Sequence, residues 1–95
     1  MVTTTVTLQQ IIDDRISFLK EQINLNNNKP EVNSTFQIQI DAIRAVDDYN
    51  MEKVESIIQH KKTLLKNSKD VHETDRLFVE LDGLEWLQRQ IARYA

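Results

Sequence analysis

IDAIRAV at residues 40–46 and LDGLEWL at residues 81–87 repeat one pattern of apolar, acidic and small residues. The longer segments 36–46 and 77–87 align without a gap at an offset of 41 residues, and only one position breaks the match of polarity. Apolar residues in both segments recur at steps of three and four residues, the spacing of one face of an α-helix. Each segment is therefore predicted to be the second helix of a helix–loop–helix unit. Whether the two units descend from a duplication or only share an amphipathic pattern stays open.

The composition of the chain favours one small helical domain. Its 95 residues are 40% hydrophobic and 28% charged, which is typical of a globular domain. One glycine and one proline supply little turn chemistry for a β-sheet, so helices are favoured. The absence of cysteine excludes disulfides and thiolate metal sites. We predict a single helical domain over residues 1–95, in which residues 1–6 form a flexible N-terminal tail.

Four amphipathic helices are expected in this domain. Capping boxes at Thr7 and Ser34 mark two helix starts, and Asp70 gives a third capping signal. The segment 47–50 offers capping residues, Asn50 among them, but neither glycine nor proline, so a break near Asn50 is favoured while one kinked helix stays open. The expected helices span about residues 7–25, 34–49, 50–67 and 71–94. The predicted fold is all-α, a small antiparallel helical bundle of two αα-hairpins.

The apolar faces of these helices lead to the predicted binding site. Phe18 and Leu25 are expected to widen the core stripe of the first helix, whereas the second and fourth helices are apolar on two sides. One interpretation packs the second and fourth helices on each other within the chain. The other places this second face at a dimer or partner interface, because tryptophan is frequent among binding hot spots. The predicted partner-binding residues are Val79, Gly83 and Trp86, with Glu80, Asp82 and Glu85 as a polar rim.

No constellation for catalysis or metal binding is found in the sequence. His60 and His72 stand outside the spacing of metal-ligand motifs, and adjacent acidic residues on a helix point about 100° apart. A single glycine rules out a glycine-rich phosphate loop, and no combination of nucleophile, base and orienting group is evident. We expect a protein that is not an enzyme and that has no catalytic residues, no metal site and no cofactor.

The distribution of charge argues against nucleic acid as the main partner. The net charge is −3, with seven acidic and four basic residues in 1–50 and eight of each in 51–95. Nucleic-acid-binding domains usually carry a basic stripe. No apolar run approaches the ~20 residues that span a bilayer, so no membrane association is expected and the predicted location is a bacterial or host cytosol. The residues of an alternative nucleic-acid patch are Lys61, Lys62, Lys66 and Lys69.

These features favour a non-catalytic protein–protein interaction module. In size, charge, helical-hairpin build and a composition rich in Asn, Lys and Ile, the chain resembles in style the small accessory and inhibitor proteins of phages and other mobile elements, anti-CRISPR proteins among them. That resemblance implies binding to a host protein, such as a defence or replication protein. A homodimer is also expected. Two alternatives stay open: a nucleic-acid-binding regulator that uses the lysine patch, and a self-assembling structural subunit.

Overall fold

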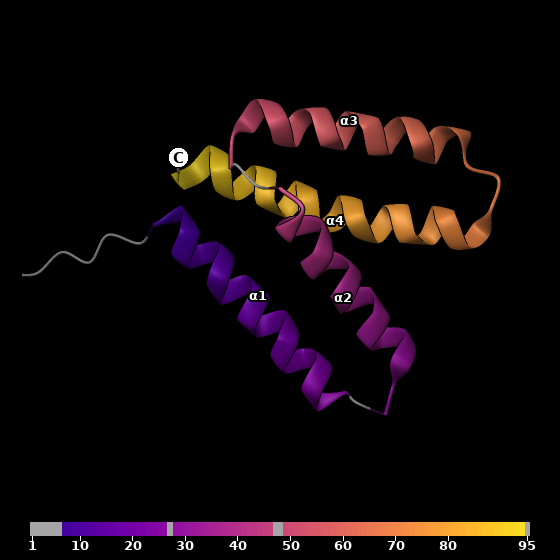
Figure 1. Cartoon of the computed structure of the whole chain (residues 1–95), viewed down its shortest axis with the longest axis horizontal. Helices are drawn as coiled ribbons and strands as arrows, with labels where there is room; N and C mark the ends of the chain where they lie inside the picture. The colour runs from indigo at the N-terminus through magenta and orange to yellow at the C-terminus, as the bar shows by residue number, and fades with distance from the viewer. Residues whose placement is uncertain (1–6, 27, 47–48, 95) are drawn as a thin grey trace, which may run out of the picture.

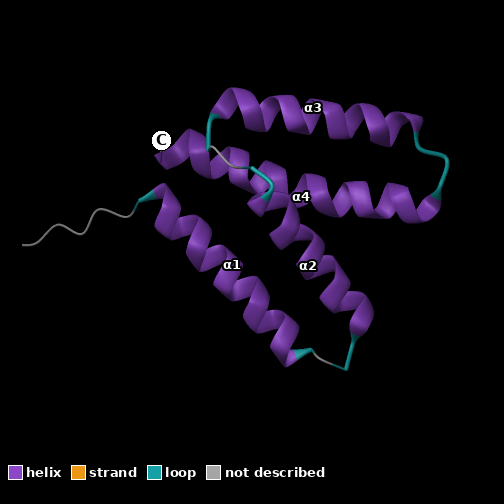
Figure 2. Ribbon diagram, viewed as in Figure 1, coloured by secondary structure: helices purple, strands orange, loops and turns teal. Residues whose placement is uncertain are grey.

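The computed structural model describes residues 7–26, 28–46 and 49–94, and these residues form four α-helices without a strand (Figures 1 and 2). In Figure 1, α1 lies antiparallel to α2 and α3 lies antiparallel to α4. The prediction of an all-α fold built from two helical hairpins is confirmed. The predicted tail, residues 1–6, lies outside the described residues. The helices are α1 (Leu8–Leu25), α2 (Pro30–Arg44), α3 (Met51–Asn67) and α4 (Val71–Tyr94).

Helix α4 is the centre of the arrangement. Its backbone approaches each of the other three helices, while the backbone of α3, within the described residues, comes close only to that of α4 (Figure 1). Helix α2 crosses α4 near its middle, so the two hairpins meet at an angle. The Cα atoms extend only 17 Å along the shortest principal axis, so the molecule is flat. A flat array of helices leaves large parts of its outer helix faces in contact with solvent.

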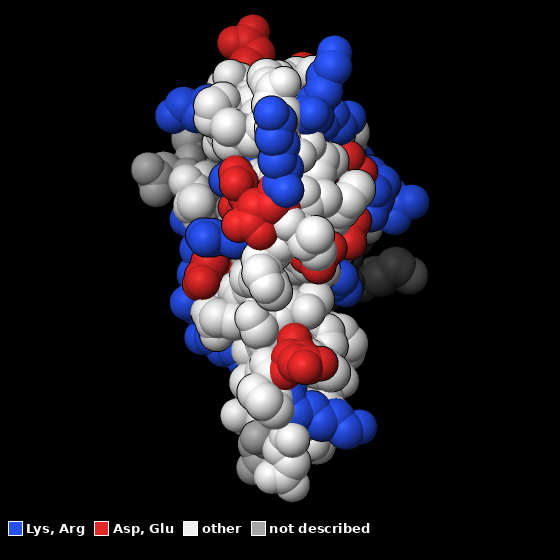
Figure 3. Space-filling model, turned by 90° about the vertical axis from the view of Figure 1, so that its right-hand side faces the viewer, with Lys and Arg blue, Asp and Glu red and all other residues white. Residues whose placement is uncertain are grey.

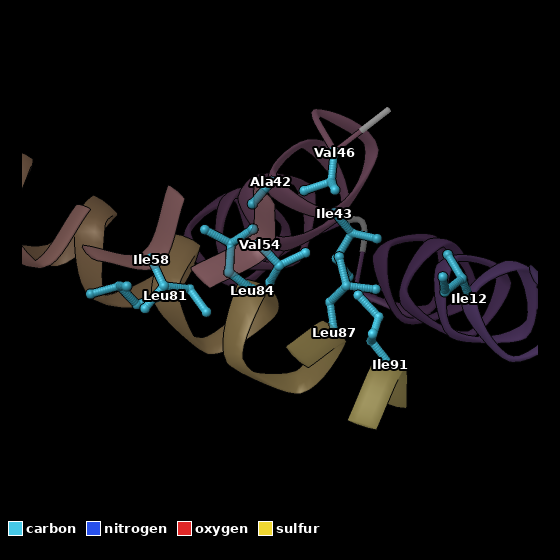
Figure 4. Packing of buried hydrophobic residues seen from close by; sticks show 10 residues of the cluster. All are labelled: Ile12, Ala42, Ile43, Val46, Val54, Ile58, Leu81, Leu84, Leu87 and Ile91. Atoms are coloured by element: carbon cyan, nitrogen blue, oxygen red, sulfur yellow. The ribbon is translucent and has the colours of Figure 1, made fainter. Parts of the chain in front are cut away.

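The hydrophobic core forms where the two hairpins meet, with α4 contributing most of it. In Figure 4, Ile43 of α2 lies above Leu87 of α4, and Ile12 of α1 lies to one side of this pair; all three belong to one hydrophobic cluster. Burial of each such side chain stabilises the fold by about 1.5–3 kcal/mol. The apolar residues that recur at steps of three and four along α4 are buried: Leu77, Leu81, Leu84, Leu87 and Ile91. The core cluster consists of Ile12, Ala42, Ile43, Val46, Val54, Ile58, Leu81, Leu84, Leu87 and Ile91.

The predicted bounds of the second helix are wrong at both ends. Helix α2 begins at Pro30, four residues before the expected start at Ser34. Proline suits the first helical position, because its ring fixes φ near the helical value and the N–H it lacks would have no partner within the helix. Ser34 therefore lies inside the helix. At the other end the chain leaves the helix after Arg44, and Val46 then enters the core.

Capping side chains begin the other helices where the sequence predicts. Thr7 accepts a hydrogen bond from the Gln10 backbone N–H at 3.2 Å, which starts α1. Asn50 accepts one from the Glu52 backbone N–H at 2.8 Å and starts α3. The favoured break near Asn50 is thus confirmed, and α2 and α3 are separate helices. None of the described helices combines the length and the apolar character needed to cross a membrane.

Candidate protein-binding site

Gly83 lies at the crossing of α2 and α4. A Cβ atom placed on Gly83 would come within 3.3 Å of the Gln39 carbonyl oxygen and 3.5 Å of the Gln39 Cα. Because Gly83 has no side chain, the two helix backbones can approach closely. Glycine inside a helix costs about 1 kcal/mol relative to alanine, and this close approach explains why it is nevertheless present here. Gly83 is buried within its own chain and offers no surface to a partner.

The other predicted binding residues lie on different sides of α4. Val79 is half-buried and faces α2 across a groove that Ile38 and Pro30 also line. Glu80 points towards α3, where its Oε2 accepts a hydrogen bond from the Lys61 Nζ at 2.7 Å. Asp82 is exposed. The six residues therefore do not form one continuous face with a polar rim.

The glutamates of the predicted rim face lysines of α3. Besides Lys61, Glu80 has the Arg76 Nε 3.4 Å from its Oε1, and its side chain is only 13% exposed. Glu85 has the Lys62 Nζ 3.9 Å from its Oε1. Two of the four lysines in the alternative nucleic-acid patch, Lys61 and Lys62, are thus next to acidic groups. The other two are exposed.

Trp86 is half-buried and packs against the core, with Arg15 of α1 across its ring. The Arg15 Cζ lies 5.3 Å from the centroid of the Trp86 ring and 5.7 Å from that of the Phe18 ring. Both distances are within the range of cation–π attraction. Phe18 itself remains 48% exposed. An aromatic ring of each hairpin and a guanidinium group therefore meet at the surface where α1 passes α4.

A row of α1 side chains extends this surface along the helix. Steps of four, three, four and three residues place its members on one face of α1, beside the core-facing residues Ile12 and Leu19. Leu25, at its end, is 70% exposed. We name this row the α1 seam, and its members are Ile11, Arg15, Phe18, Gln22 and Leu25.

The expectation that Phe18 and Leu25 widen the core stripe of the first helix is wrong. The buried residues of α1 are Ile12 and Leu19, whereas Phe18 and Leu25 are large apolar residues that remain exposed. The signal that could have separated them was the alternation of three and four residues between positions 11 and 25, which is distinct from the row through Ile12 and Leu19. Sequence reasoning also missed Arg15, because only the fold brings it to Trp86.

A groove between α2, α3 and α4 is a further concave feature of the described residues. It has a volume of about 490 Å³ and an apolar wall that includes Ile38, Ala42 and Ile57. Four charged residues line it: Lys61 donates a hydrogen bond to Glu80, Arg76 also lies beside Glu80, and Asp41 accepts a hydrogen bond from Gln37. Figure 3 shows the side of the molecule where α2 begins: acidic and basic groups are mixed over the α3–α4 end, and the end of the α1–α2 hairpin below is largely uncharged.

The described residues contain no group of three or more His, Asp or Glu side chains placed to hold a metal ion. His60 and His72 are both exposed. Comparison of the chain with protein-family models, with curated protein sequences and with solved structures gives no match. The candidate site is therefore chosen on geometry alone: it is the surface formed by Trp86 and the α1 seam, where aromatic and apolar side chains are exposed beside Arg15.

Proposed function

We propose that the chain is a non-catalytic protein–protein interaction module that docks through Trp86 and the α1 seam. The observation that carries this proposal is the stacking of Arg15 against Trp86, next to the large exposed side chains Phe18 and Leu25. Tryptophan and arginine are enriched among the residues that dominate binding energy at protein interfaces. Two large apolar groups beside them supply area that a partner can remove from water.

The order already present at this surface favours tight docking. Arg15 is held against two rings, so less side-chain freedom is lost when a partner binds than for an arginine that extends freely into water. Trp86 is supported by the core beneath it. A rigid aromatic group with an exposed apolar surround matches the centre of known interfaces, where well-packed anchors are ringed by weaker contacts.

For the partner we propose a protein of a host cell, which the resemblance in style to phage accessory and inhibitor proteins implies. The residues proposed for docking differ from those expected from the sequence: Trp86 is retained, and residues of α1 take the place of those of α4 that face α2 and α3. A second copy of the chain is the competing occupant of the same surface.

Affinity capture tests this proposal. The tagged chain is incubated with a bacterial lysate beside Phe18→Ala and Phe78→Ala variants. Phe78 is a matched control, because it is 53% exposed on the N-terminal half of α4, away from the α1 seam. We expect one specific protein to be retained by the wild type and by Phe78→Ala, and lost from Phe18→Ala. Equal recovery with all three baits would show that docking occurs elsewhere.

A further inference from the structure

We infer that the α1 seam receives a helix of the partner, and that this helix carries a carboxylate within its apolar stripe, opposite Arg15. The inference rests on the proposed function and names the partner chemistry for the same surface. Its three supports are the spacing of the seam, the guanidinium of Arg15, which forms no ion pair with a described residue, and the acidic groups beside the seam.

The spacing of the seam is that of a helix-packing surface. Side chains at alternating steps of three and four residues form the a and d positions of a coiled coil, into which the knobs of a second helix fit. In α1 the d positions are the apolar residues Ile11, Phe18 and Leu25, and the a positions are Arg15 and Gln22. The buried residues of α1, Ile12 and Leu19, lie on the neighbouring face of the helix, and of the seam residues Arg15 also contacts Trp86 of α4. An incoming helix would lie along the seam and reach Trp86 at Arg15.

Arg15 decides what that helix must carry. Within the described residues, Arg15 takes part in no ion pair and no side-chain hydrogen bond, and its contacts are the two aromatic rings. A helix that covers the seam removes water from the guanidinium, and an uncompensated charge at an interface is strongly unfavourable. A carboxylate on the partner compensates it, since the fork of arginine N–H groups matches two carboxylate oxygens. A partner helix with only apolar residues would leave this charge unpaired.

The neighbouring charges favour one carboxylate over a polyanion such as nucleic acid. Asp14 and Glu21 are exposed and occupy positions that flank the seam on one side. A row of phosphates along α1 would approach these carboxylates, whereas a single acidic side chain at Arg15 would not. The same two residues favour lysine or arginine at the flanking positions of the partner helix. The expected partner segment is therefore an amphipathic helix with basic flanks and one acidic residue in its apolar stripe.

Synthetic helices test this inference directly. Three peptides of about 21 residues, or three heptads, carry leucine at the a and d positions and lysine at the flanks, and differ only at a central position: Glu, Gln or Lys. They contain no tryptophan, so fluorescence reports only on Trp86, the single tryptophan of the chain. Sedimentation first establishes the concentrations at which the peptides are monomeric.

We expect the Glu peptide to bind at least about tenfold more tightly than the Gln peptide, with the Lys peptide weakest. In the Arg15→Gln variant the Glu and Gln peptides should bind within about twofold of each other. Phe18→Ala should weaken all three peptides, and Phe78→Ala should weaken none. This pattern assigns the preference for an acid to Arg15 and the affinity to the seam.

Other results would overturn the inference, and they separate it from the proposed function. If wild-type protein binds the Glu and Lys peptides equally, the carboxylate is wrong although docking stands. If no peptide changes Trp86 emission while Phe18→Ala still abolishes capture from the lysate, the partner is not a helix of this kind. If the chain dimerises through the seam and Phe18→Ala makes it monomeric, a second copy occupies the surface.

Discussion

Gly83 of α4 lies directly against the backbone of Gln39 in α2, and this close approach sets how the two hairpins meet. A Cβ on residue 83 would be 3.3 Å from the Gln39 carbonyl oxygen, which is closer than ordinary van der Waals contact. The oxygen belongs to the backbone of a helix, so it can move only if α2 moves. The crossing of α2 and α4 therefore depends on a small residue at this position.

Substitution of Gly83 should distinguish a small side chain from a branched one. Gly83→Ala gains about 1 kcal/mol of helix propensity but crowds Gln39, so we expect its free energy of unfolding to change by less than about 1 kcal/mol. Gly83→Val adds a Cβ and two methyl groups at the crossing and should destabilise the fold by roughly 2–3 kcal/mol. Urea unfolding followed by circular dichroism measures both. A Val variant as stable as the Ala variant would contradict this close contact.

Truncation of the core at Ile43 should cost several kilocalories. Ile43 is fully buried against α4, and removal of an isoleucine side chain to Ala in such a place typically destabilises a protein by about 2–5 kcal/mol. Val71→Ala is the control, because Val71 is 71% exposed and its change should stay within about 0.5 kcal/mol. A similar effect of the two substitutions in urea unfolding would show that Ile43 is not in the core.

The two lysine–glutamate pairs between α3 and α4 should differ in strength. Lys61 and Glu80 are partly buried with 2.7 Å between Nζ and Oε2, whereas Lys62 and Glu85 are more exposed with 3.9 Å between Nζ and Oε1. A double-mutant cycle with Lys61→Met and Glu80→Gln should give a coupling energy of about 1 kcal/mol. The same cycle on Lys62 and Glu85 should give nearly zero. Coupling of equal size in the two cycles would contradict the geometry.

Binding of DNA should be weak and nonspecific. Lys61 is engaged by Glu80 and Lys62 faces Glu85, whereas Lys66 and Lys69 of the alternative patch form no ion pair with any described residue. Two lysines release few counterions, and we expect an affinity no tighter than about 10⁻⁴ M for duplex DNA at physiological salt. Fluorescence anisotropy with a labelled duplex measures this. If the wild type binds DNA much more tightly and the double variant Lys66→Gln/Lys69→Gln loses this binding, the alternative of a nucleic-acid-binding regulator is favoured.

The fold could be predicted from the sequence to the extent that local signals decide it. Caps at Thr7 and Asn50, and the periodic stripe of α4, act within a few residues, and these features are confirmed. The predicted start of α2 was wrong because two local signals compete. Ser34 offers a capping box, but Pro30 already suits the first helical position. Extension of the helix by one turn adds backbone hydrogen bonds, and nothing in the residues between prevents it.

The candidate site was less predictable because it depends on how the hairpins cross. The sequence shows that α4 has a second apolar side but not which helix covers it. The crossing at Gly83 places α2 over that position, while Glu80 faces α3 and Trp86 faces Arg15 of α1. An angle between two hairpins is a tertiary property, set by close packing of side chains at the contact. Residues that share one helix face can therefore contact different neighbours.

The contact of Arg15 with Trp86 gives a prediction that needs no partner. In Arg15→Ala the indole loses the guanidinium that covers it, so its emission should move to longer wavelength and acrylamide should quench it more strongly. The lost cation–π contact should lower the free energy of unfolding by about 1 kcal/mol. Arg89→Ala is the matched control, since Arg89 is exposed on the same helix as Trp86 and, within the described residues, takes part in no ion pair or cation–π contact. Arg89→Ala should leave the emission of Trp86 unchanged. If Arg15→Ala also leaves it unchanged, the placement of Arg15 over the ring is contradicted.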